Sequence, residues 1–289
     1  MTSPPALERL LRRDRIVTLA GVVVLCLLAW AYIVMGAGFG MNAGEMLRVA
    51  LFPHTDAMRM PVDMDGMSME MMAPAPAPAP AHWTLALWAL TIGMWWAMMI
   101  AMMSPAASPT ILLYARVHRH AIAGGRSQDR LAPTGAFLLG YLLVWFAFSL
   151  GAAALQWMLI HRGVVSPGMS SSQSRWLSAG VLIAAGFYQL SPLKAACLAH
   201  CRDPAAFLSR HWRPHAWGAV RLGILHGGFC VGCCWLLMAL LFVGGVMNLV
   251  WIAALAILVL VEKLMPPGRW IGQAVGLGLI AWGIATLFA

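Results

Sequence analysis

Soft donor side chains are unusually abundant in this sequence, whose 289 residues include 21 Met, 6 Cys and 9 His. Thioether and thiolate sulfur are soft ligands that select Cu(I), and imidazole also binds copper. These donors gather in four clusters along the chain. The residue types therefore predict soft-metal binding, with Cu(I) as the expected ion.

The first cluster is the segment 58–72, with the sequence MRMPVDMDGMSMEMM. Its methionines include Met64, Met67 and Met69, and the acidic residues between them create a negative field that attracts cations. The alternative is a loop in which methionine is incidental. Exposed methionine is prone to oxidation, so we expect this density to serve metal capture.

The second cluster is the run GMWWAMMIAMMSP, in which Met94, Met98 and Met102 follow one another at intervals of four. On a helix this spacing produces one stripe about 12 Å long. The motif locally resembles the pore helix of eukaryotic copper-uptake transporters, although the rest of the chain does not. The alternative interpretation is that methionine fills gaps in a core.

The third cluster is the run HGGFCVGCCWLLM, which contains His226, Cys230, Cys233 and Cys234. Two or three of these thiols facing one helix side could hold a soft metal, and a histidine inside a membrane is usually functional. The alternative is cysteine as a small packing residue beside glycines. We expect a Cu(I) site shared with Met98, whose loading releases protons and weakens as the pH falls.

The fourth cluster is YQLSPLKAACLAHCRDP, in which Cys197 and Cys201 are four residues apart and His200 lies beside them. A reducing cytoplasm keeps such thiols unpaired, so they could accept a metal. An ordinary interfacial helix is the alternative. Further histidines are expected on the same side of the membrane: His118, His120, His211 and His215.

Composition places these clusters in a membrane protein. The chain is 61% hydrophobic and only 10% charged, with a mean hydropathy of +0.78, whereas soluble chains carry about a quarter charged residues. One bilayer crossing needs roughly 20 apolar residues. We therefore expect an all-α, polytopic membrane helix bundle of about seven transmembrane helices. The expected spans are 16–39, 83–103, 134–160, 176–193, 217–243, 246–264 and 271–288.

Three parts follow from these spans. Residues 1–39 form a basic cytoplasmic N-terminus and the first anchor span. Residues 40–82 form an external loop, in which the Met-rich segment precedes a Pro-Ala repeat of semi-rigid polyproline II character. Residues 83–289 form a six-helix membrane domain that carries the other three clusters.

The basic residues predict the orientation, because Lys and Arg concentrate in cytoplasmic loops. Of the 19 Lys and Arg, fifteen fall on the same side as the N-terminus. The exceptions are Arg48, Arg59, Arg162 and Arg175. We expect the N-terminus inside and the C-terminus outside a bacterial cytoplasmic (inner) membrane. The net charge of +9 then reflects topology, and no nucleic-acid partner is expected.

Taken together, MWWAMMIAMMSPAASP, YQLSPLKAACLAHCRDP and GGFCVGCCWLLMALLFVGGVMN followed by EK resemble a bacterial family. It is catalogued as domain of unknown function 2182 and described as predicted metal-binding integral membrane proteins. The resemblance covers roughly 83–270. It implies a membrane location and metal binding but names no metal and no activity.

The expected function is Cu(I) transport or delivery across or within the membrane. The chain contains no P-loop, so transport would be passive or ion-coupled. A membrane thiol/quinone redox enzyme using Cys230 and Cys233 is the first alternative, although such chemistry needs an accessible pair. The second is a non-catalytic assembly subunit. Expected partners are the bilayer, the metal ion, and a membrane or periplasmic protein or a second copy of the chain.

Overall fold

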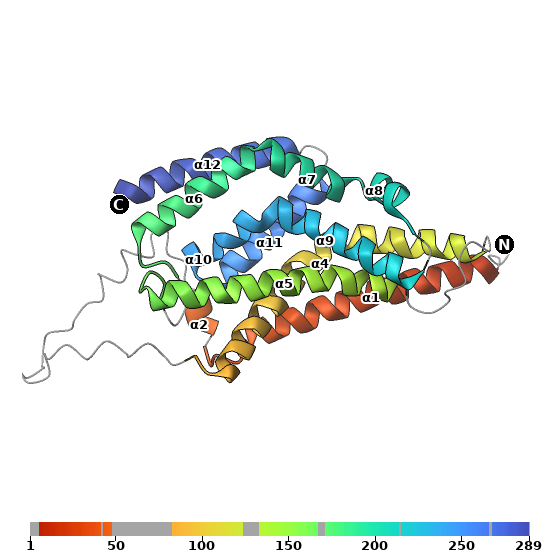
Figure 1. Cartoon of the computed structure of the whole chain (residues 1–289), viewed down its shortest axis with the longest axis horizontal. Helices are drawn as coiled ribbons and strands as arrows, with labels where there is room; N and C mark the ends of the chain where they lie inside the picture. Colours follow the sequence, from red (N-terminus) through yellow and green to blue (C-terminus); the bar gives the residue numbers. More distant parts are fainter. Residues whose placement is uncertain are drawn as a thin grey trace, which may run out of the picture.

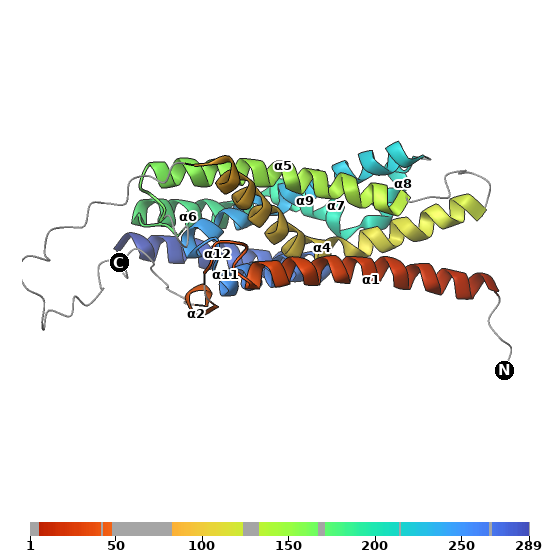
Figure 2. The same ribbon diagram turned by 90° about the horizontal axis from the view of Figure 1, so that it is seen from below.

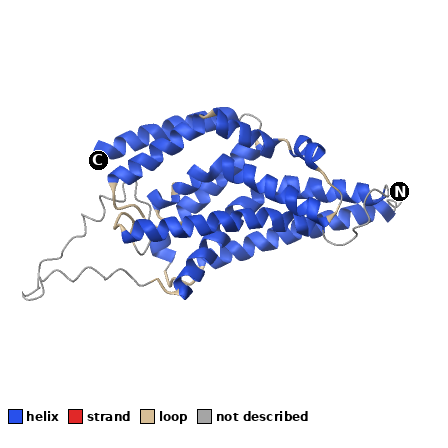
Figure 3. Ribbon diagram, in the orientation of Figure 1, coloured by secondary structure: helices blue, strands red, loops and turns tan. Residues whose placement is uncertain are grey.

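The computed structural model describes residues 6–41, 43–47, 83–123, 133–166, 171–213, 215–265 and 268–288. These residues are helical apart from short connections, as Figure 3 shows. One isolated β-bridge, Val165 with Ser172, is the only sheet-like pairing among them. The all-α expectation is therefore confirmed.

The first half of the chain forms three long helices and one short one. Their apolar runs have no polar face wide enough for a soluble surface helix, as expected for lipid contact. The bounds are α1 (Ala6–Val34), α2 (Ala43–Met46), α4 (Leu85–Ala123) and α5 (Pro133–His161).

The second half contains a broken helix followed by a compact core. Helices α6 and α7 meet at an angle of 63°, because Ser191 ends α6 while its hydroxyl caps the N–H of Lys194, and Pro192 starts α7. The bounds are α6 (Arg175–Leu190), α7 (Pro192–Arg202), α8 (Pro204–His211), α9 (Ala216–Ala239), α10 (Leu241–Gly244), α11 (Leu249–Leu264) and α12 (Gly268–Phe288).

The helices lie roughly along one direction, with α6 beside α12 at one edge and α1 at the other (Figure 1). Helix α4 crosses the bundle and packs against α1. Helix α9 runs through the middle and packs along α5, while α7 and α11 also contact it. Seen from below, α4 changes direction along its length (Figure 2). The third and fourth sequence clusters therefore meet at the centre of the bundle.

Glycines allow α5 and α9 to approach closely. A Cβ atom at Gly223 would lie 2.0 Å from the carbonyl oxygen of Phe137, and one at Gly140 would lie 2.1 Å from that of Val220. Gly227 similarly faces Val144 of α5. The glycine-containing face of α9 thus packs against α5.

Helix α4 is longer than the sequence predicted. The expected span ended at residue 103, but the helix continues to Ala123 with Pro105 and Pro109 inside it. Membrane helices tolerate internal proline because side chains and neighbouring helices satisfy the freed carbonyls. Here the hydroxyl of Ser108 donates to the carbonyl of Pro105 at 2.8 Å.

Five of the described helices are long and apolar enough to cross a membrane, or six if the bent pair α6–α7 counts as one span. These correspond to six of the expected spans. The remaining one, 246–264, is the 16-residue helix α11, so the count of seven stays a prediction.

Candidate metal site

Four thiols from two helices come together in the core. Cys230, Cys233 and Cys234 of α9 are at most 2% exposed. Cys201 of α7 is buried and lies within hydrogen-bonding reach of Cys230 and Cys233. We call Cys201, Cys230, Cys233 and Cys234 the thiol cluster. All four cysteines are reduced.

Helix α4 adds a thioether to this cluster, and α5 adds a phenol. The sulfur of Met103 lies 3.9 Å from the sulfur of Cys234. The hydroxyl of Tyr141 donates to the carbonyl of Met103 at 3.1 Å and lies 3.3 Å from the Cys230 sulfur. Tyr141 therefore ties the methionine helix to the cysteine helix at the point where their sulfur atoms meet.

A lysine from α11 completes the surroundings. Lys263 is buried, and its ammonium donates a hydrogen bond to the Cys230 sulfur at 2.8 Å. Ammonium has donors only, so the sulfur is the acceptor and its thiolate form gains a compensating charge. An anionic ligand can thus exist in an apolar core before any metal arrives.

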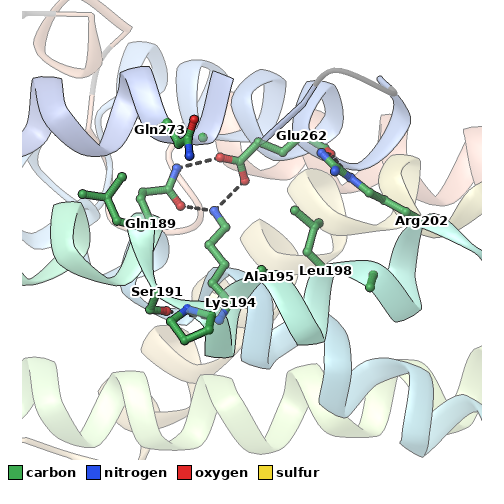
Figure 4. A pocket seen from close by; sticks show the side chains of 12 residues that line it. Gln189, Ser191, Lys194, Ala195, Leu198, Arg202, Glu262 and Gln273 are labelled. Carbon is green, nitrogen blue, oxygen red and sulfur yellow. Dashed lines mark hydrogen bonds and ion pairs between the residues drawn. The ribbon is translucent and has the colours of Figure 1, made fainter. Parts of the chain in front are cut away.

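A second polar network surrounds Glu262, the residue that precedes Lys263, as Figure 4 shows. Glu262 pairs with Lys194 at 2.6 Å and accepts from the amide of Gln189 at 2.6 Å. Lys194 also donates to the Gln189 carbonyl, and Arg202 donates to the Glu262 carbonyl at 2.8 Å through Nε. These groups border a cavity of about 590 Å³ between α6, α7, α11 and α12.

His226 lies one helical turn before Cys230 and is 2% exposed. Its Nδ1 has no hydrogen-bond partner, although its ring is surrounded by Phe137, Tyr141 and Phe207 at centroid distances of 5.4 to 6.0 Å. An unsatisfied buried nitrogen costs roughly 1–3 kcal/mol. Such an atom is more easily explained if it serves a ligand.

The fourth sequence cluster divides between two places. Cys197 is half-buried against Gly232, where an added Cβ would meet its sulfur at 3.0 Å, and Cys201 joins the thiol cluster. His200 is turned away and stacks on Phe229 at 4.1 Å. His200 was expected beside these thiols. Adjacent positions on a helix differ by about 100°, so His200 and Cys201 project in different directions from α7.

The methionine stripe of α4 lies inside the protein. Met94, Met98 and Met102 are each at most 2% exposed. The thioether that contacts a cysteine is that of Met103, one helix position beyond the expected stripe. Met64, Met67 and Met69 lie outside the described residues.

The donor set fits a soft monovalent ion better than a harder divalent one. Within the described segments, no three His, Cys, Asp or Glu side chains are arranged to hold a metal together. Cu(I) tolerates low coordination and accepts thioether sulfur, so two cysteines with Met103 are an adequate set.

Sequence reasoning missed Tyr141, Lys263, Glu262, Lys194 and Met103 as parts of the site. Lys263 and Lys194 had been assigned to inner loops as topology signals, whereas both are buried. The available signal was the pair Glu262–Lys263 at the end of an apolar span, because ionisable residues within spans are rarely incidental.

The fold and the site thus define a helical protein with several candidate membrane spans and a buried soft-donor cluster. A family model described as "PpoB2: Copper chaperone" matches residues 92–286. The chain therefore belongs to this copper chaperone family, and copper binding follows from that membership. The name domain of unknown function 2182 is not confirmed by this match. No curated protein and no solved structure matches the chain.

Proposed function

We propose that the protein binds Cu(I) at the thiol cluster and Met103 and delivers it across or within the cytoplasmic membrane. One observation carries this proposal: Cys201 of α7 meets Cys230 of α9 inside the core, and Met103 of α4 lies against the same thiol cluster. Membership in a copper chaperone family supports the choice of metal. His226, one turn away, is a further candidate ligand.

The decisive experiment is anaerobic copper analysis of the purified protein. Wild type should retain Cu(I), and the Cys230/Cys233/Cys234→Ser variant should lose most of it, because hydroxyl oxygen is a poor ligand for a soft ion. The matched control is Cys26→Ser on α1, a half-buried thiol next to Ser104, which should leave the stoichiometry unchanged. Equal copper in wild type and a folded triple variant would refute the site.

We also propose that the N-terminus lies inside and the C-terminus outside, as the distribution of basic residues favours. On this orientation, the α7–α8 end of the bundle faces the cytoplasm. A C-terminal alkaline phosphatase fusion should be active, and a C-terminal green fluorescent fusion should be dark. The opposite pair of results would reverse the orientation.

A further inference from the structure

A second group of nitrogen donors lies outside the thiol cluster, at the end of the bundle where α7 meets α8. His200 and His211 line the same pocket, which has a volume of about 240 Å³. Both side chains are only partly buried. The pocket therefore opens to the surface of the protein, unlike the thiol cluster.

The hydrogen bonds of both histidines determine which ring nitrogen can bind a metal. Nδ1 of His200 lies 2.9 Å from the carbonyl of Ala196, and Nδ1 of His211 lies 3.0 Å from that of Phe207. A carbonyl only accepts, so Nδ1 must carry the proton in each ring. Nε2 then holds the lone pair, and a fixed Nδ1–H is the usual support of a metal-binding imidazole.

The charges around the pocket predict a weak site. Asp203 and Arg210 both line it, so the negative charge of the carboxylate and the positive charge of the guanidinium offset each other. Attraction for a cation must then come from the two imidazoles. Imidazole suits copper but lacks the softness of thiolate, and a weaker site exchanges its ion more readily.

Aromatic rings lie between this pocket and the thiol cluster. Phe229 stacks on His200 with an interplanar angle of 4° and directly precedes Cys230. Phe207 contacts the ring of His211 at a centroid distance of 5.1 Å and the ring of His226 at 5.4 Å. Nδ1 of His226 has no hydrogen-bond partner. The possible metal ligands thus follow one another in space, from His200 and His211 at the surface, through His226, to the thiol cluster in the core.

We propose that His200 and His211 form a surface Cu(I) position through which the ion passes, by way of His226, between the thiol cluster and a water-soluble carrier. The inference rests on the proposed function. Each step is an exchange of one ligand for another on Cu(I), so no electron is transferred. The buried cluster sets how much copper is held, and the surface histidines set how fast it leaves.

The test measures release of copper from the loaded full-length protein to an excess of a water-soluble, disulfonated Cu(I) chelator under anaerobic conditions. The His200→Phe/His211→Phe variant keeps aromatic rings in the pocket but removes both nitrogens. It should bind as much Cu(I) as wild type and release it at least ten-fold more slowly. Each single variant should show a smaller slowing, and the single variants carry the test if the double variant does not fold.

The matched control is His161→Phe. His161 also holds its Nδ1 against a carbonyl, that of Trp157 at 3.1 Å, but it lies at the other end of the bundle. Its release rate should equal that of wild type. Wild-type release from the double variant would overturn the surface position, and so would loss of bound copper from a folded variant. Absence of copper in wild type would instead refute the proposed function.

Discussion

Replacing Gly223 with alanine should prevent α5 and α9 from packing at their present separation. The added Cβ would lie 2.0 Å from the Phe137 carbonyl oxygen and 2.9 Å from the Tyr141 nitrogen. Both are backbone atoms, so a rotamer change cannot relieve the overlap. Overpacking a core costs about 1–3 kcal/mol and sometimes more, and a whole-helix displacement falls at the upper end. Thermal unfolding in detergent should show a large loss of stability.

Gly228→Ala is the matched control on the same helix. An added Cβ at Gly228 meets nothing within 4 Å, and alanine is favoured over glycine within a helix by about 1 kcal/mol. This variant should melt at or slightly above the wild-type temperature. Equal melting of the Gly223 and Gly228 variants would mean that the seam between α5 and α9 is looser than the structure shows.

Replacing Lys263 with methionine should weaken Cu(I) binding by roughly 100-fold or more. Cu(I) bound to two thiolates carries a net charge of −1, and the ammonium of Lys263 next to Cys230 balances it. Removing one partner of a buried ion pair costs about 3–5 kcal/mol, and each 1.4 kcal/mol is about ten-fold in affinity. Competition with a chelator of known Cu(I) affinity measures the change.

Lys263→Arg separates charge from shape, because arginine keeps the positive charge. It should retain most of the affinity that Lys263→Met loses. The opposite possibility is that the ammonium merely competes with the metal for the Cys230 sulfur. In that case Lys263→Met would bind Cu(I) more tightly than wild type, and the charge-balance explanation would be wrong.

Much of the helical framework could be predicted because lipid imposes a simple rule on composition. Each apolar run must form a helix long enough to satisfy its own backbone, so α1, α5, α9 and α12 appear close to their expected positions. Helix α4 was harder, since Pro105 looked like a stop signal but lies within the helix. The carbonyl of Pro105 is satisfied within the same helix by the hydroxyl of Ser108.

The site was only partly predictable, for reasons of rotation and long-range contact. The spacing of the α9 cysteines predicts that they lie near one another within one helix, and all three are buried. Which methionine meets them depends on how α4 is turned, and the sulfur of Met103 lies 3.9 Å from that of Cys234. The contact of Lys263 joins residues 33 positions apart, and no local pattern encodes it.

The position of Met103 along α4 has an electrical consequence. Met103 lies 18 residues after the start of α4, and its neighbour Cys234 lies 18 residues after the start of α9. On the proposed orientation these two helices start on opposite sides of the membrane, so their sulfur atoms meet within the span and not at either face. A monovalent cation gains or loses about 2.3 kcal/mol per 100 mV over the full drop, and each half of its path crosses part of that drop. Loading from the outer face and release toward the α7–α8 end would thus both follow the membrane potential.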